Sequence, residues 1–210
     1  MCGIWGRIER NGRLKPDLNR CDAITQLLAH RGPDEDGRYF ADDVYLGHRR
    51  LRVIDLEQGK QPMCDASGRY WVVYNGEIYN YRELRDEIEA CGRSIRTNSD
   101  TEILVEAYAL WKEDCLRRFN GMWAFCIYDK QEKECFLARD RLGIKPLYYY
   151  CNPDTFIFGS EVKVIIANED VPKQIDPFAV RDFLSHNYIP QPRTIIKNIR
   201  QLPPYAIPLW

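Results

Sequence analysis

A cysteine stands at the second position of the chain, in the sequence Met1-Cys2-Gly3-Ile4. If the initiator methionine is removed, Cys2 carries a thiol and a free α-amine on one residue. The thiolate is the reactive form of cysteine. The α-amine ordinarily titrates at ~7.7–8.0, close enough to the ~8.5 of a thiol to act as its base. Position alone does not establish a nucleophile, because most cysteines are buried small hydrophobic residues.

Three later segments carry side chains suited to binding a small polar molecule. They are Gly47–Asp55, which is rich in arginine, Asn75-Gly76-Glu77, and Ser99–Glu102. Each also has a purely structural interpretation. Asn-Gly after a strand is the commonest signal of a hairpin turn, Glu77 and Asp100 are acceptable first-turn helix acids, and a run of arginines can be a solvated surface.

The elements that must position these residues follow from the hydrophobic pattern. Strands are expected at 3–8, 38–40, 44–49, 70–74, 123–128, 135–138, 147–151 and 155–158. Helices are expected from Pro16-Asp17, at 81–91, from Ser99 (where Ser99-x-x-Glu102 matches a capping box), at 161–166 and at 177–186. The grouping of strands and helices, rather than strict alternation, predicts an α+β layered fold with antiparallel sheets.

Composition places the chain among soluble globular proteins. Its 210 residues are 45% hydrophobic and 29% charged, with a net charge of −1, which gives no electrostatic reason to expect nucleic acid or membrane partners. No signal peptide or membrane-spanning stretch is evident, so we expect a cytoplasmic protein whose eight cysteines are reduced thiols. No C-x-x-C pair occurs and the three histidines are scattered, so no metal site is expected.

Five motifs beyond the N-terminal Cys-Gly-Ile occur in a fixed order. They are His30–Asp34, Gly47–Asp55, Asn75–Asn80, Ser99–Glu102 and Ala138–Tyr149. Together they resemble the glutaminase domain of the asparagine synthetase family, which are glutamine amidotransferases with an N-terminal nucleophile. The resemblance covers essentially the whole chain. It implies a four-layer α/β/β/α sandwich with two mainly antiparallel sheets.

The resemblance also implies a domain organisation. Residues 1–188 would form the glutaminase domain. Residues 189–210, which are rich in proline and show no further periodic element, would form a connecting segment towards an absent synthetase domain.

The resemblance assigns roles at the reacting end of glutamine. The thiolate of Cys2 would attack the side-chain amide, the Cys2 α-amine would protonate the departing ammonia, and water would hydrolyse the thioester. The side-chain amide of Asn75 and the backbone N–H of Gly76 would form the oxyanion hole. Both are hydrogen-bond donors, and glycine lets a substrate approach the backbone closely.

Free glutamine is a zwitterion, so its site needs a cation for the α-carboxylate and a carboxylate for the α-ammonium. By resemblance Arg50 binds the carboxylate, and Asp100 and Glu77 bind the ammonium. The backbone from Leu51 to Ile54 would line the pocket, including Leu51, Val53 and Ile54.

Two other features receive no catalytic role. A Cys–His pair with His30 or His48 is disfavoured, because the α-amine already serves as base in enzymes of this kind. The segment Arg139–Tyr149 is interpreted as a strand junction that braces the sheets. Neither a metal nor an organic cofactor is expected in this domain.

The Ser-Gly-Gly-x-Asp-Ser loop that holds ATP phosphates in asparagine synthetases does not occur in the 210 residues. ATP and magnesium are therefore expected only in a synthetase domain or subunit that would be the partner, and the surface facing it should expose apolar residues. The ammonia acceptor is left open, and a homodimer is possible. Two alternatives also remain: the glutaminase half of another amidotransferase, and a non-catalytic regulatory module of the same fold.

Overall fold

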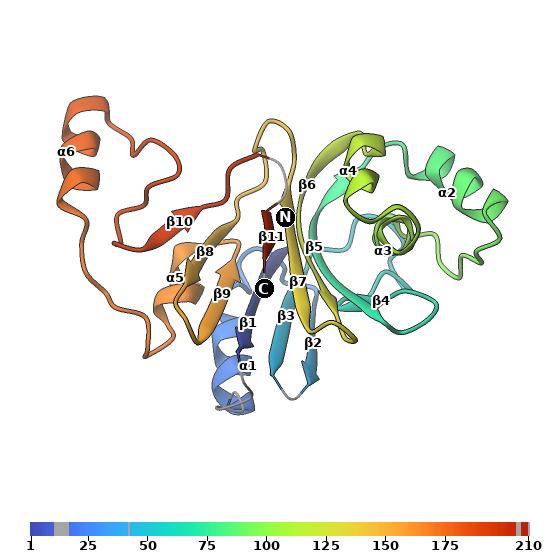
Figure 1. Ribbon diagram of the computed structural model, residues 1–210, viewed down its shortest axis with the longest axis horizontal. Coiled ribbons are helices and arrows are strands. Elements are labelled where there is room, and N and C mark those ends of the chain that lie inside the picture. Colours follow the sequence, from blue (N-terminus) through green and yellow to red (C-terminus); the bar gives the residue numbers. More distant parts are fainter. Residues whose placement is uncertain (11–16, 42, 205–206, 210) are drawn as a thin grey trace.

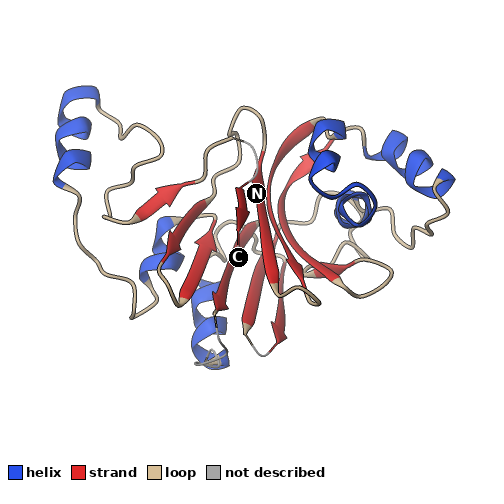
Figure 2. Cartoon of the chain, in the orientation of Figure 1, coloured by secondary structure: helices blue, strands red, loops and turns tan. Residues whose placement is uncertain are grey.

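The computed structural model describes residues 1–10, 17–41, 43–204 and 207–209. Its centre is a pair of stacked β-sheets in which every pairing of strands is antiparallel (Figures 1 and 2). The six-stranded sheet has the order β10-β8-β9-β1-β3-β2, and the five-stranded sheet has the order β11-β7-β6-β5-β4.

The strands of the six-stranded sheet are β1 (Gly3–Glu9), β2 (Glu35–Ala41), β3 (Val44–Arg50), β8 (Tyr148–Cys151), β9 (Thr155–Gly159) and β10 (Ile199–Gln201). Those of the five-stranded sheet are β4 (Met63–Cys64), β5 (Tyr70–Ile78), β6 (Gly121–Asp129), β7 (Glu134–Arg139) and β11 (Ile207–Leu209). The helices are α1 (Leu18–Gln26), α2 (Tyr81–Ala90), α3 (Asp100–Trp111), the 3-10 turn η1 (Lys112–Asp114), α4 (Cys115–Arg118), α5 (Val162–Ile166) and α6 (Pro177–His186).

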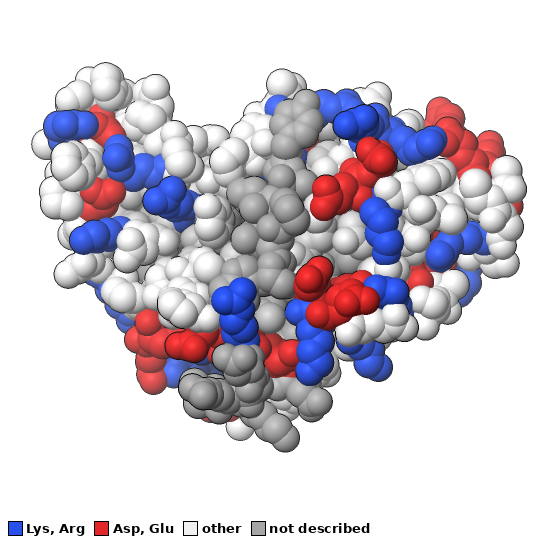
Figure 3. Space-filling view, in the orientation of Figure 1, with Lys and Arg blue, Asp and Glu red and all other residues white. Residues whose placement is uncertain are grey.

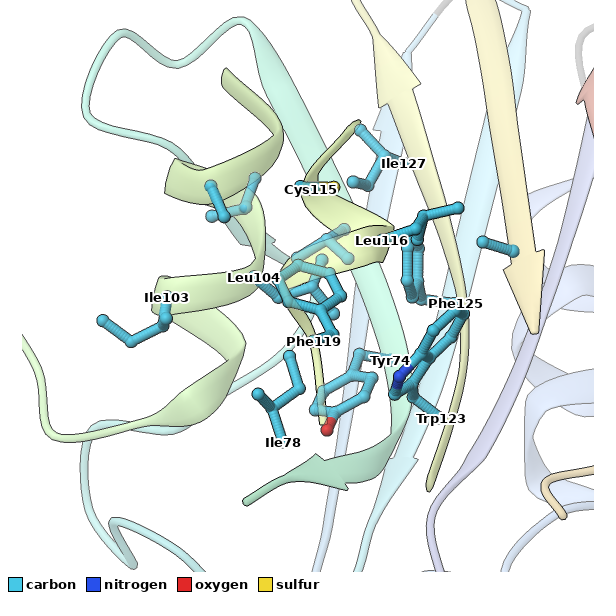
Figure 4. Close-up of a cluster of buried hydrophobic side chains, with 14 of the residues drawn as sticks. Tyr74, Ile78, Ile103, Leu104, Cys115, Leu116, Phe119, Trp123, Phe125 and Ile127 are labelled. Atoms are coloured by element: carbon cyan, nitrogen blue, oxygen red, sulfur yellow. The ribbon is translucent and has the colours of Figure 1, made fainter. Parts of the chain in front are cut away.

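Three apolar clusters hold four layers together. Between the sheets, Ile4 and Leu46 of one sheet meet Val73 and Leu137 of the other, all fully buried. Helices α1 and α5 cover the outer face of the six-stranded sheet. Helices α2, α3 and α4 cover the outer face of the five-stranded sheet, where aromatic rings gather under α3 and α4 (Figure 4). The expected α/β/β/α sandwich is therefore confirmed.

Strand β5 runs further than the sequence pattern indicated. It was expected to end at Tyr74, yet its pairing with β6 continues without interruption through Asn75 and Gly76 to Ile78. The hairpin-turn interpretation of Asn75-Gly76 is therefore wrong. The interpretation of Glu77 as a helical acid is also wrong, because Glu77 lies within the strand and α2 begins only at Tyr81.

Helix starts differ from expectation in detail. Ser99 does cap α3, since its hydroxyl accepts from the N–H of Thr101 at 3.2 Å. Glu102, however, does not complete a capping box: its carboxylate accepts the N–H groups of Arg96 and Thr97 instead. Asp17 caps α1, whereas Pro16 lies outside the described residues.

The sequence predicted no regular structure after Tyr188, and this prediction is wrong. β10 pairs with β8 and β11 pairs with β7, so this stretch contributes a strand to each sheet. Strands of three residues are too short to show a period in the sequence. The domain boundary at residues 188–189 stays a prediction.

Helix α6 stands apart from the four layers, at the left of Figure 1. On the face shown in Figure 3, basic and acidic side chains are interspersed in small groups, and the outline is notched between the α6 lobe and the sheets. Within the described ranges, no helix combines the length and hydropathy needed to cross a membrane.

Candidate active site

A cavity of about 160 Å³ opens where the ends of several elements meet. Cys2 directly precedes β1, and Arg50 ends β3, which pairs with β1 so that Gly3 faces Arg49. Asn75 lies near the end of β5, and Asp100 is the first residue of α3. All nine residues singled out in the sequence line this cavity: Cys2, Arg50, Leu51, Val53, Ile54, Asn75, Gly76, Glu77 and Asp100.

The Cys2 side chain is held against the backbone of Leu51. Its sulfur accepts from the Leu51 N–H at 3.4 Å, and the Leu51 carbonyl lies 3.6 Å from the same sulfur. The Cys2 carbonyl accepts a hydrogen bond from Nε of Arg31 at 3.0 Å. Burial raises the pKa of the thiol above its ordinary value, opposed by the Leu51 contact and by nearby positive charge. The thiol therefore needs a base to become nucleophilic.

Asn75 faces the space between the sheets, on the same side of β5 as Val73. Asn75 is 1% exposed, and within the described part of the chain its side-chain nitrogen Nδ2 has no hydrogen-bond partner. A buried amide donor without a partner costs about 1–3 kcal/mol and so calls for an explanation, and beside a cavity such a donor is available to a bound oxygen. Gly76 follows, and a Cβ there would lie 2.3 Å from the Met122 carbonyl oxygen.

Asp100 is buried at the N-terminus of α3, and its Oδ2 has two donors. They are the hydroxyl of Tyr74 at 2.9 Å and the N–H of Ile78 at 3.1 Å. Burial raises the pKa of Asp100 above its ordinary value, and the charge of Glu77 adds to that rise, while the two hydrogen bonds oppose it. Asp100 and Glu77 thus place two carboxyl groups on one cavity.

Arg50 is 4% exposed, so it is no solvated surface residue. One terminal nitrogen donates to Glu35 at 3.0 Å and to the Leu56 carbonyl at 3.4 Å; the other donates to the carbonyls of Ile54 and Asp55 at 3.2 and 2.6 Å. These four contacts use the N–H groups of both terminal nitrogens. Within the described residues, Nε is the guanidinium nitrogen that makes no hydrogen bond.

The loop after β3 wraps closely around the Arg50 side chain. A Cβ at Gly59 would lie 2.2 Å from the Arg50 guanidinium and 2.9 Å from the Asp55 carbonyl oxygen, so a side chain here would displace the contacts that hold Arg50. Val53, 58% exposed, lines the cavity from its outer side.

Neither histidine near these motifs lines the cavity. His48 is fully buried between the sheets, and its Nε2 lies 3.2 Å from the Tyr74 carbonyl. Burial lowers its pKa to about 3, which makes it neutral near pH 7. His30 contacts Glu161 and Lys163 instead. A Cys–His pair is therefore not formed.

The segment Arg139–Tyr149 braces the junction after β7, as expected. The Asp140 carboxylate accepts four backbone N–H groups, those of Trp123, Leu142, Ile144 and Lys145. Arg139 donates to the carbonyls of Lys145 and Leu202 at 2.6 and 2.8 Å, and to that of Gly143.

The structure adds cavity residues to which the sequence analysis gave no role in the site: Tyr74, Met122 and Lys145, together with Gly59, Gln61, Ser99 and Thr101. Position next to Asn75 in a strand was the available signal for Tyr74. Nothing in the sequence spacing indicated that Lys145, 70 positions after Asn75, lines the same cavity. In the described ranges, no group of three or more His, Cys, Asp or Glu side chains is arranged to hold a metal ion, and none of the eight cysteines is bridged.

This fold and site define a class: two stacked antiparallel sheets between helical layers, with a cavity at a cysteine next to the N-terminal residue. Two solved structures share the fold. One is the glutamine phosphoribosylpyrophosphate amidotransferase from B. subtilis with ADP and GMP, with a TM-score of 0.62 at 19% identity over 79% of this chain and 43% of that one. The other, an allosteric regulatory enzyme of purine biosynthesis, has a TM-score of 0.64 at 20% identity over the same shares.

The family follows from sequence comparison. A family model described as a glutamine amidotransferase domain matches residues 1–209. Asparagine synthetases [glutamine-hydrolyzing] 3 and 1 of Bacillus subtilis are 39% and 41% identical to this chain over 207 residues, which is 97% of it. A putative asparagine synthetase [glutamine-hydrolyzing] 2 of Methanocaldococcus jannaschii is 39% identical over 96% of the chain. The chain belongs to the glutamine amidotransferase domain family and is homologous to glutamine-hydrolysing asparagine synthetases.

The chain spans about a third of the length of these relatives: 34%, 32% and 42% respectively. The match therefore concerns one domain of each relative. The identity of 39% and 41% to the two Bacillus subtilis asparagine synthetases, against 19% and 20% to the two solved structures, favours the asparagine synthetase branch.

Proposed function

We propose that this domain hydrolyses the side-chain amide of L-glutamine to glutamate and ammonia, with Cys2 as the nucleophile after removal of Met1. The observation that carries the proposal is the buried Nδ2 of Asn75, which has no partner in the described residues and borders the cavity that also holds Cys2. A donor left free at that place suits the negative oxygen of a tetrahedral intermediate.

The proposed chemistry is acyl transfer. The Cys2 sulfur bonds to the amide carbon as its thiol proton passes to the α-amine, and the oxygen becomes an oxyanion held by Asn75 Nδ2 and the Gly76 N–H. The α-amine then gives the proton to the leaving nitrogen, the C–N bond breaks, and ammonia departs. Water hydrolyses the thioester by the same steps, which releases glutamate and restores the thiol.

Recognition of the amino-acid end is assigned to Arg50, Asp100 and Glu77. The two carboxylates suit the α-ammonium. Arg50 suits the α-carboxylate through its Nε–H in the present conformation, since its other N–H groups are engaged. The backbone from Leu51 to Ile54 closes this end of the cavity, together with the side chain of Val53.

We further propose that the ammonia is supplied to an ATP-dependent synthetase domain or subunit that makes asparagine, with ATP and magnesium bound there and no cofactor here. The length of the relatives supports a partner domain. Leu142 and Ile144 are 83% and 54% exposed on the loop that carries Lys145, which suits a covered surface. A cytoplasmic location and a homodimer belong to the same proposal.

The test is glutamine hydrolysis by the chain with Met1 removed, followed by ammonia release and mass spectrometry. A glutamine-mimicking diazo-ketone should modify Cys2 and leave the other seven cysteines free. The domain alone, given aspartate, ATP and magnesium, should make no asparagine. Absence of both hydrolysis and Cys2 labelling would favour a non-catalytic module of the same fold.

A further inference from the structure

The loop between β7 and β8 delivers a lysine into the active-site cavity. Lys145 is 5% exposed and lines the cavity together with Cys2, Gly76 and Glu77. Two hydrogen bonds hold its backbone in place: Asp140 accepts the Lys145 N–H at 3.0 Å, and Arg139 donates to the Lys145 carbonyl at 2.6 Å. The braced segment thus has a second consequence: it fixes a cation beside the nucleophile.

The Lys145 ammonium has no strong acceptor within the described residues. Its Nζ lies 3.3 Å from Sδ of Met1, a thioether that is a weak acceptor, and no described carboxylate lies within 4.0 Å. Lysine is rarely buried without a charged partner. Burial lowers its pKa and the charge of Arg31 adds to this, while the charges of Glu77, Cys2 and Asp140 act in the opposite direction.

In this structure, which still carries Met1, the same contact bounds the distance from Lys145 Nζ to the backbone nitrogen of Cys2, the atom that becomes the α-amine when Met1 is removed. Sδ of Met1 is five bonds from that nitrogen, so Nζ lies at most about 10 Å from it. At an effective dielectric constant of about 20, a unit charge at that distance shifts a pKa by about one unit. A cation disfavours a second cation, so the shift is downwards for an amine.

The other charged groups around Cys2 are compensated or act differently. Arg31 pairs with Glu161 at 3.0 Å, and Glu161 also contacts His30 and Lys163.

Arg50 pairs with Glu35 at 3.0 Å. Asp100 and Glu77 favour protonation of the amine, but bound glutamine would neutralise them with its ammonium. Lys145 is therefore the cavity cation that has no carboxylate within 4.0 Å among the described residues, although Glu77 lines the same cavity.

We propose that Lys145 is a positioning residue that acts through the Cys2 α-amine: its fixed positive charge keeps that amine unprotonated near neutral pH, so that it can accept the thiol proton. This inference rests on the proposed glutaminase function. It predicts a defect that alkaline pH repairs, which a packing role for Lys145 would not produce.

The experiment compares Lys145→Met and Lys145→Gln, which remove the charge, with Lys145→Arg, which retains it. Lys173→Met, at an exposed lysine, is the matched control. The acid limb of kcat/KM against pH should move up by about one unit in both neutral variants, with activity restored at high pH. The arginine variant and the control should keep the wild-type profile.

A second readout does not need turnover. Titration of the Cys2 α-amine by ¹⁵N NMR, in protein labelled at cysteine, should show the amine pKa raised in the neutral variants and unchanged in Lys145→Arg. An amine pKa within roughly 0.2 units of wild type in both neutral variants overturns the inference, whatever the activity. If the wild type hydrolyses no glutamine, the proposed function fails, and the titration still decides the role of Lys145.

Discussion

The two ends of the cavity are built in different ways. At the reacting end, Cys2 precedes β1 and Asn75 and Gly76 lie inside β5, so paired strands fix the groups that would do chemistry. At the recognition end, Arg50 is gripped by Glu35 and by carbonyls of the loop after β3. The first end presents a donor, Asn75 Nδ2, that has no partner among the described residues, whereas at the second end Arg50 is already hydrogen-bonded.

The difference has an energetic meaning. Stabilisation of a transition state requires donors that are in place before charge develops, and strands supply that rigidity. At the recognition end, a ligand carboxylate that binds Arg50 must instead share the guanidinium with the acceptors that already bond to it inside the protein. We therefore expect substitutions at the reacting end to change kcat and those at the recognition end to change KM.

The largest effect should come from Cys2→Ala. Loss of the nucleophile should lower the rate of glutamine hydrolysis by at least ~10⁴-fold. The α-amine and the oxyanion hole act only on bonds that the sulfur makes, so they cannot compensate for its loss. Ammonia release is the measurement, and Cys91→Ala, at an exposed cysteine, is the control that should keep full activity. Activity retained in Cys2→Ala would remove the basis for the whole comparison.

The next effect is at Asn75. Asn75→Ala should lower kcat by roughly 10²–10³-fold with KM little changed, since the donor acts on a charge that develops only in the transition state. Asn75→Asp, which keeps the shape but loses the amide donor, should behave alike. Steady-state kinetics for both variants decide this, and a change confined to KM would move Asn75 to the recognition end.

Asp100→Asn should change KM rather than kcat, the reverse of the result expected for Asn75→Ala. An asparagine carbonyl can still accept from Tyr74 and Ile78, so the fold is kept while the charge that would meet the α-ammonium is lost. KM for glutamine should rise about 10- to 100-fold with kcat little altered, the range expected for a lost charged hydrogen bond. Asp114→Asn, at an exposed carboxylate, should leave both constants unchanged.

His48 lies under the reacting end and gives a prediction for stability. The unfolded chain binds a proton on this imidazole below its ordinary pKa of 6.5, whereas the folded chain does so only near 3. The free energy of unfolding should therefore fall as pH drops through this window, by up to roughly 1.4 kcal/mol per pH unit. Denaturant unfolding of wild type and His48→Gln should show a shallower decline in the variant; equal slopes would contradict the buried neutral state.

The smallest effect is expected at Glu35, which belongs to the recognition end of the cavity. Glu35 faces Arg50 across the β2–β3 pair and takes part of its charge. Glu35→Gln keeps an acceptor for Arg50 but removes the competing carboxylate, so KM for glutamine should fall about 3- to 10-fold. A rise in KM would mean that the charge of Glu35 is needed to hold Arg50 in its binding orientation.

Much of this domain could be predicted from local pattern. The strand at Gly3–Glu9, the helix at Tyr81–Ala90 and the layered α+β class follow from periodicity and from turn chemistry. Patterns failed where pairing with a distant strand overrode local signals. Asn75-Gly76 remains in a strand because β6 pairs along its whole length. Strand β10 is too short for any period and exists because β8 offers an edge.

The sequence by itself determined which chemical groups are available: a thiol at the second position, the Asn75 amide beside a run of apolar residues, and charges of both signs in ordered motifs. Only the tertiary structure decided which of them meet. It paired Arg50 with Glu35, left Asn75 Nδ2 without a described partner, and turned Lys145 towards the cavity of Cys2. The physical reason is that these contacts join elements far apart in the chain, whose relative positions are set by the packing of two sheets and not by the residues beside them.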